Sequence, residues 1–232
     1  MKLFDSGAML PKYYENHKKV HDLLVPILTL IVSPIISILM FATSGANLVS
    51  TSISKLGWQN DMLAVVYIWG LLNLALICYV LKLVLDNGQY SKASKILLYS
   101  IFGLGCAILL VGLSVPFIND DVPQHILMRT VHNTFATLGF VMLVILLIAL
   151  TVMTFFRNKK QALISSCAMA FLIITGIFAV LEVNSPARIT FITAAAQLYI
   201  FAVLEVLLAL QYFLNQFLKN DRIDKTSADD IA

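Results

Sequence analysis

Charged side chains are scarce in this chain of 232 residues, since Asp, Glu, Lys and Arg together make up 12% of it. Soluble proteins carry about 25%. Hydrophobic residues account for 59%, and the mean hydropathy is +0.88. This composition argues against a soluble domain, and the net charge of +3 gives no reason to predict binding to nucleic acid.

The usual catalytic and metal-binding motifs are missing as well. The sequence contains no H-E-x-x-H, no G-x-S-x-G and no C-x-x-C, and it has only four histidines. Its cysteines, Cys78, Cys106 and Cys167, all fall in apolar runs, where a thiol behaves as a small apolar group. We therefore predict no cofactor, no metal and no disulfide framework, and we do not favour an enzyme.

Long apolar runs are what the chain has instead. A bilayer core about 30 Å thick requires roughly 20 apolar residues of helix. Six runs approach or exceed that length: 23–42, 62–85, 96–115, 135–156, 162–181 and 189–214. They lack both the polar face of a soluble helix and the alternation of barrel strands. The sequence thus predicts an all-α, polytopic protein of the cell membrane, a bundle of six transmembrane helices.

Lysine and arginine indicate how this bundle is oriented. They gather before the first run, in the second and fourth loops and in the tail, whereas the other side holds only Lys55, Arg129 and Arg188. By the positive-inside rule, both termini are cytoplasmic. Residues 1–22 would form a cytoplasmic interfacial lead-in, 23–217 the transmembrane domain, and 218–232 a disordered cytoplasmic tail.

Several residues inside the runs predict local structure. Pro34 should kink the first helix near Ser33, with the hydroxyl groups of Ser33 and Ser37 satisfying the carbonyl that proline frees. Asn73 should hydrogen-bond to another helix, because an amide facing lipid is costly. Small residues should let two helices approach closely; they are Gly103, Gly105, Gly112, Ala136 and Gly139.

Glu205 is the one acidic residue well inside an apolar run, about 6 Å from the midpoint of that run. A charged carboxylate there costs about 2.5 to 3.5 kcal/mol, so it must be protonated, paired or facing water. Together with Gln197 and Asn73 it favours a second interpretation, a small transporter or proton-coupled carrier.

The densest polar stretch outside the termini opens the fourth helix. Asp121 is predicted to cap it, with Pro123 in the first turn and Gln124 completing a capping box. His125, Arg129 and His132 then lie on one face, at spacings of four and three residues. In the first outer loop, a short interfacial helix should end in a turn at Gly57, with Trp58 at headgroup depth.

The polar residues of the outer side can converge on one mouth, and three interpretations stay open. In the first, ion pairs between arginines and carboxylates only hold the loops together. Alternatively, Arg129 and Arg188 grip the phosphate or carboxylate of a lipid or amphiphile, or the mouth docks a membrane protein. A hydrolase would use His125 and His132 as zinc ligands, or a serine with a histidine base. The predicted ligand-binding residues are Ser54, His125, Arg129, His132, Glu182 and Arg188.

Three short motifs carry a resemblance: S-I-S-K-L-G at 52–57, V-H-N at 131–133 and P-A-R-I at 186–189. Across residues 23–214 the chain resembles the DUF998 group of bacterial membrane proteins, which is similar in layout to the Frag1/DRAM/Sfk1 family. The resemblance implies a six-helix bundle of largely undefined function, linked in eukaryotes to membrane-lipid organisation. It also implies Ser54, Gly57, His132 and Arg188 as site residues, while Lys55 stands where the group usually has an acidic residue.

Overall fold

The regular elements of the described chain are all helices, as predicted. The computed structural model describes residues 12–45, 53–59, 61–88, 90–118, 122–156, 159–183, 198 and 201–216. The elements are α1 (Lys12–Ile27), the π-helical segment η1 (Leu28–Val32), α2 (Ser33–Ser44), α3 (Ile53–Gln59), α4 (Leu63–Asn87), α5 (Lys92–Ser114), α6 (Pro123–Phe155) and α7 (Lys159–Val183). A last helix, Phe201–Gln216, is called the C-terminal helix below.

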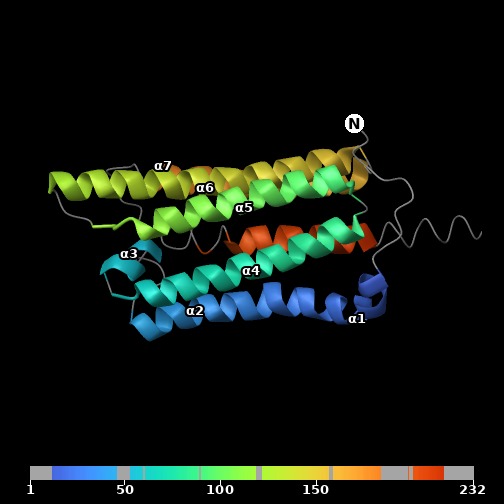
Figure 1. Ribbon diagram of the computed structural model, residues 1–232, viewed down its shortest axis with the longest axis horizontal. Coiled ribbons are helices and arrows are strands. Elements are labelled where there is room, and N and C mark those ends of the chain that lie inside the picture. Colours follow the sequence, from blue (N-terminus) through green and yellow to red (C-terminus); the bar gives the residue numbers. More distant parts are fainter. Residues whose placement is uncertain are drawn as a thin grey trace, which may run out of the picture.

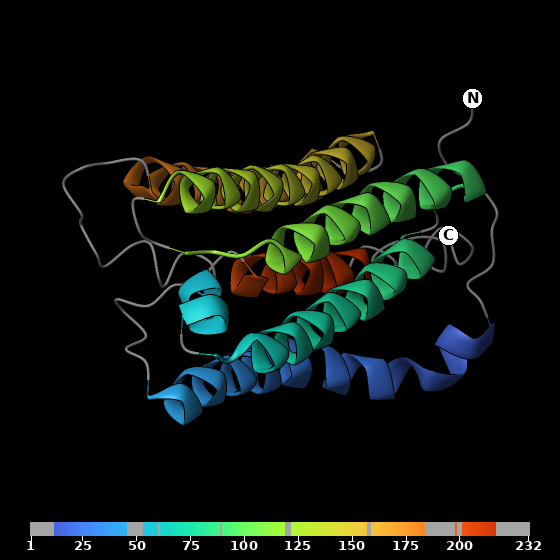
Figure 2. The same ribbon diagram turned by 60° about the vertical axis from the view of Figure 1, so that its left-hand side comes forward.

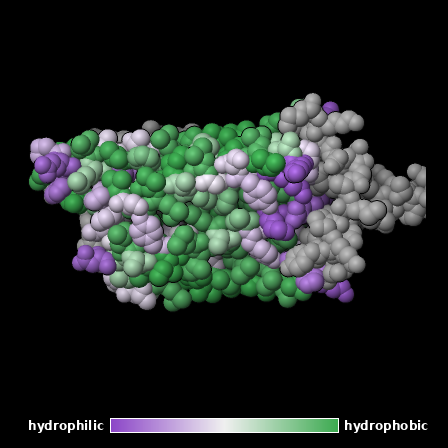
Figure 3. Space-filling view, viewed as in Figure 1, coloured by the Kyte–Doolittle hydropathy of each residue, from purple (hydrophilic) through white to green (hydrophobic). Residues whose placement is uncertain are grey.

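Among the described residues, four helical stretches are long and apolar enough to cross a membrane: His17–Ser44, Leu63–Asn87, Lys92–Ser114 and Pro123–Phe155. They coincide with the first four apolar runs of the sequence. Apolar side chains form the visible surface between two more polar ends of the molecule (Figure 3). The chain is therefore a multi-pass membrane protein. Helix α7 covers the fifth run, and the described part of the sixth run is the shorter C-terminal helix.

The long helices lie side by side along one axis (Figures 1 and 2). Helix α6 packs on α5 and on α7, while α4 packs on α2 and α3. The C-terminal helix lies in the middle of the bundle, and its buried Leu204, Leu208 and Tyr212 belong to the main core cluster with residues of α4, α5 and α6. We call the two ends of the bundle the α3 end and the α1 end.

Close packing of α5 against α6 confirms part of the predicted small-residue face. A Cβ atom on Gly105 would lie 3.1 Å from Cβ of Met142, and one on Gly112 would lie 3.0 Å from Cβ of Phe135. A Cβ atom on Gly139 would lie only 2.5 Å from Cγ of Leu109. Gly103 does not belong to this contact, since a Cβ atom there would meet nothing within 4 Å.

Near Pro34 the first span changes its hydrogen bonding. The N–H group of Ser33 bonds to the carbonyl oxygen of Leu28, five residues back, which ends the π-helical segment η1. Ser37 donates its hydroxyl proton to the carbonyl of Ser33 at 2.9 Å, and not, as predicted, to the carbonyl that Pro34 frees, which is that of Leu30 four residues back. The hydroxyl group of Ser33 instead reaches across to α4. The disturbance near Ser33 is thus a π-helical joint between α1 and α2.

Two predicted helix ends were wrong. Helix α6 begins at Pro123, but its N-cap residue is Val122 and no side chain caps it, while Asp121 lies outside the described residues. The missing N–H of proline reduces the need for a cap. Helix α3 continues through Gly57 to Gln59 instead of ending in a turn there. A Cβ atom on Gly57 would lie 3.4 Å from Cδ1 of Leu63, an ordinary contact distance, so packing does not explain why this residue is a glycine.

Candidate functional site

A buried Ser–His pair lies at the α3 end. The hydroxyl oxygen of Ser54 on α3 is 2.8 Å from Nε2 of His132 on α6, although 78 residues separate them in the sequence. Ser54 is 6% exposed and His132 is 2% exposed. Two of the residues predicted for the mouth are therefore in direct contact.

The second ring nitrogen of His132 determines which group donates in this pair. Nδ1 of His132 lies 2.9 Å from the carbonyl oxygen of Val115, an atom that can only accept. Nδ1 therefore carries the proton, and in the neutral ring Nε2 accepts the hydroxyl proton of Ser54. The ring of Phe117 packs against the imidazole, with 5.2 Å between centroids. This arrangement orients a serine toward a base, with a carbonyl where a catalytic triad has a carboxylate.

Helix α3 is fixed to the bundle by more than this pair. The indole N–H of Trp58 donates to the carbonyl oxygen of Leu113 at 3.1 Å, near the end of α5. Leu56 is fully buried and clusters with Phe41 and Val66 of the neighbouring spans. The α3 segment is thus a short cover over the ends of α2, α4 and α5, and Ser54–His132 is its link to α6.

Helix α6 extends beyond this cover. The hydrogen bond between His132 and Val115 puts His132 level with the end of α5. The nine preceding residues of α6, Pro123 to Val131, add about 14 Å of helix beyond that level, and the tip of α6 is plainly visible past α5 (Figure 1). Half-buried His125 and Arg129 lie on this projecting segment, which we call the α6 overhang.

Of the residues predicted for the mouth, the structure thus brings Ser54 and His132 together and sets His125 and Arg129 on the same helix. Glu182 lies in the last turn of α7, and its side chain falls outside the described residues. Arg188 and Gln197 also lie outside them. Within the described parts of the chain, no group of three or more His, Cys, Asp or Glu side chains is placed to hold a metal ion.

The predicted partner of Asn73 lies on another helix, as expected. Ser33 donates its hydroxyl proton to Oδ1 of Asn73 at 2.9 Å, and Nδ2 of Asn73 donates to the carbonyl oxygen of Trp69 at 2.8 Å. Glu205 is fully buried in the C-terminal helix, and Ser33 is the side chain that lies against its carboxyl group. These residues join the first span, α4 and the C-terminal helix.

Sequence reasoning missed a second polar cluster, which lies toward the α1 end. Gln211 of the C-terminal helix accepts a hydrogen bond from Ser165 of α7 at 2.6 Å and donates one to Thr154 of α6 at 2.8 Å. One turn further along, Gln161 donates to Asn215 at 2.8 Å. The signal was the spacing of Gln211 and Asn215, which continues the face of the buried residues Leu204 and Leu208.

Replacing Gln211 by leucine should destabilise the bundle without changing its packing volume much. Two interhelical hydrogen bonds would be lost, and such bonds average about 0.6 kcal/mol each with a maximum of about 1.7 kcal/mol. We expect a loss of about 1 to 2 kcal/mol in denaturant unfolding. Gln124→Leu, on the exposed first turn of α6, should change stability by less than about 0.5 kcal/mol. Equal losses in both variants would contradict the interhelical role of Gln211.

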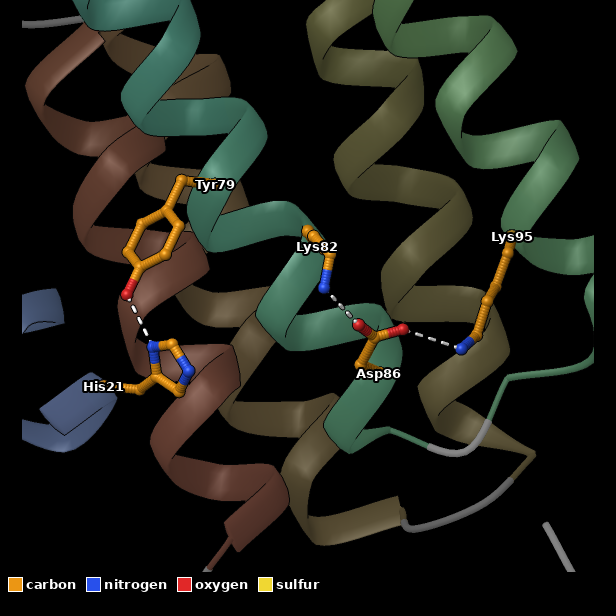
Figure 4. Close-up of polar contacts among 5 residues, drawn as sticks. All are labelled: His21, Tyr79, Lys82, Asp86 and Lys95. Carbon is orange, nitrogen blue, oxygen red and sulfur yellow. Dashed lines mark hydrogen bonds and ion pairs between the residues drawn. The ribbon is translucent and has the colours of Figure 1, made fainter. Parts of the chain in front are cut away.

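Ion pairs and further polar contacts hold the α1 end together (Figure 4). Asp86 at the end of α4 pairs with Lys82 at 2.8 Å and with Lys95 of α5 at 2.9 Å. His21 of α1 is 2.7 Å from the hydroxyl group of Tyr79. The Asp86–Lys95 and His21–Tyr79 contacts connect neighbouring helices, whereas the Lys82–Asp86 pair lies within α4, and we assign all three a structural role.

Comparison with known proteins adds no relative. No family model, no curated protein and no solved structure matches the chain.

Proposed function

We propose that this protein binds a membrane lipid, or an amphiphile like it, with the anionic headgroup at the α3 end of the bundle. In this proposal six helices cross the cell membrane, both termini are cytoplasmic, and the α3 end is extracytoplasmic. The scarcity of lysine and arginine on the α3 side supports that orientation, because basic residues concentrate on the cytoplasmic side. The resemblance to the DUF998 group, with its link to lipid organisation, agrees with it.

The α6 overhang is the observation that carries the proposal. Leu127 is 65% exposed, and its neighbours Ile126 and Met128 are also exposed. All three lie on the part of α6 that extends beyond the end of α5. Arg129 lies on the same two turns. Apolar side chains next to a guanidinium group match an amphiphile, whose acyl part covers the apolar atoms while its phosphate or carboxylate bonds to arginine.

The Ser54–His132 pair has a positioning role in this proposal. Its burial leaves little of the serine hydroxyl open to a substrate, and the imidazole is held by a neutral carbonyl. The pair joins α3 to α6 and so keeps the cover next to the overhang. Hydrolysis of the bound lipid is not part of the proposal.

Replacing Arg129 by glutamine should weaken binding of anionic lipid about tenfold, since a charge-assisted hydrogen bond contributes about 1.5 to 3 kcal/mol. The measurement uses quenching of Trp58 by brominated phosphatidylglycerol, compared with brominated phosphatidylcholine, in mixed micelles of the full chain. Trp58 lies on α3 beside the proposed site, and a Trp58→Phe variant assigns the signal, because Trp69 is the only other tryptophan.

Lys160→Gln is the matched control. It removes the same charge from the exposed start of α7, at the opposite end of the bundle, and should leave the preference for phosphatidylglycerol unchanged. Equal quenching by both lipids in the unmodified protein would refute lipid binding at this end. Loss of the preference in both variants would show that only net charge matters. A stable protein complex that protects Trp58 from quenching by both lipids would show that this end binds a protein partner and not a lipid.

A further inference from the structure

Glu205 is buried where a charged carboxylate would have no compensating partner. It is 0% exposed, and neither carboxyl oxygen has a hydrogen-bond partner in the described chain. The hydroxyl group of Ser33 lies beside the carboxyl group of Glu205, and no described charged side chain is paired with it. An isolated buried carboxylate is strongly unfavourable, so the group must hold a proton or another cation.

The direction of the neighbouring hydrogen bonds distinguishes these states. Asn73 uses Nδ2 to donate to the carbonyl of Trp69, so its Oδ1 is the atom facing Ser33. Ser33 has a single hydroxyl proton, and that proton is donated to Asn73. Toward Glu205, the hydroxyl oxygen of Ser33 can therefore only accept. The described side chains therefore offer no hydrogen-bond donor to a Glu205 carboxylate, and a protonated, neutral carboxyl group is far less costly to bury than the charged form.

We propose that Glu205 is a reversible proton-binding site in the middle of the bundle, with Ser33 and Asn73 as the side chains that respond to its proton. This inference goes beyond lipid binding at the α3 end and does not depend on it. In the loaded state the protonated carboxyl group carries no charge, and the hydroxyl proton of Ser33 stays in its hydrogen bond to Asn73. When the proton leaves to water, the carboxylate becomes acceptor-only and attracts the hydroxyl proton of Ser33 away from Asn73.

The position of Ser33 gives this exchange a structural consequence. Ser33 is the residue at which η1 meets α2, and its N–H group makes the last π-type bond. Pro34 supplies no N–H group, so this joint has fewer backbone hydrogen bonds than an unbroken helix. Reorienting Ser33 thus acts at the weakest point of the first span, where π-helical turns often mark functional sites.

No other described titratable group faces Glu205 from the elements packed around it. On the first span, Asp22 accepts hydrogen bonds from Tyr212 and Gln216. Both donors lie on the C-terminal helix, about two and three turns after Glu205. His21 contacts Tyr79 of α4 in that same region. On the side toward the α3 end, Trp69 packs edge-on against Phe201, with 5.2 Å between centroids. The proton balance at this level therefore depends on Glu205.

Infrared spectroscopy of the full chain in lipid bilayers tests the proposal directly. The sequence contains only three glutamates, Glu15, Glu182 and Glu205, so ¹³C labelling of glutamate isolates their carboxyl bands. We expect an isotope-shifted band of a protonated carboxyl group at neutral pH. It should fall reversibly as the pH is raised, with a matching rise of the carboxylate bands. Glu205→Gln should abolish it, and Ser33→Ala should shift its frequency, because the hydroxyl group beside the carboxyl group is removed.

Glu15→Gln is the control and should leave the band intact. Three results would overturn the proposal. The band could survive in Glu205→Gln, it could be missing at neutral pH, or it could persist at alkaline pH while circular dichroism shows a folded protein. A carboxylate band that responds to sodium ions at constant pH would assign the site to a metal cation and would also overturn it. Labelled wild-type protein supplies the pH titration, and circular dichroism of Glu205→Gln checks that the variant that assigns the band is folded.

Discussion

Replacing Gly139 by valine is expected to force α5 and α6 apart and to lower the free energy of unfolding by about 1 to 3 kcal/mol or more. A Cβ atom at this position would lie 2.5 Å from Cγ and 3.1 Å from the backbone nitrogen of Leu109. A side-chain atom can move aside, but the backbone of a packed helix cannot do so without shifting α5. Unfolding by denaturant, followed by circular dichroism in micelles, measures the loss.

Gly103→Ala is the matched control for this prediction. Gly103 lies on α5, the helix that Gly139 of α6 packs against, but an added Cβ atom on Gly103 would meet nothing within 4 Å. Alanine favours the helix by roughly 0.5 to 1 kcal/mol over glycine, so this variant should be as stable as the original or more so. A similar loss in both variants would mean that helix propensity, and not the close contact at Gly139, determines the result.

Replacing His132 by alanine should have the second large effect, a loss of about 1 to 3 kcal/mol. The change removes the hydrogen bonds to Ser54 and to the carbonyl of Val115, and it leaves the buried hydroxyl group of Ser54 without its partner. Because the link between α3 and α6 is lost, Trp58 should also become more exposed. We expect its fluorescence emission to move to longer wavelength before the main unfolding transition.

A double-mutant cycle separates the Ser54–His132 bond from the other contacts of the histidine. Ser54→Ala, His132→Ala and the double variant should show a coupling energy of about 0.6 to 1.7 kcal/mol, the range for hydrogen bonds between membrane helices. His125→Ala, two turns away on the overhang, should show no coupling with Ser54→Ala. Additive effects of the Ser54 and His132 substitutions would contradict the proposed positioning role.

Local patterns explain which features could be predicted. Apolar length is a property of consecutive residues, so the runs predicted the four helices that are long enough to cross a membrane. The need of a buried amide for a partner is equally local, and Asn73 does bond to another helix. Small residues on one face likewise predicted the close contact at Gly105, Gly112 and Gly139.

The partner of each polar group depended on how the helices are arranged, which no local pattern contains. The sequence placed Ser54 and His132 on the same side of the membrane, but only the packing of α3 across the end of α5 brought them into contact. The partners of Gln211 became apparent only from the packing of the C-terminal helix, which places this side chain between Ser165 of α7 and Thr154 of α6. By itself, the sequence determined that the chain resides in a membrane and which side chains require partners there. Tertiary structure decided which groups met, because hydrogen bonds form between helices whose order in the bundle is set by shape and volume along their whole length.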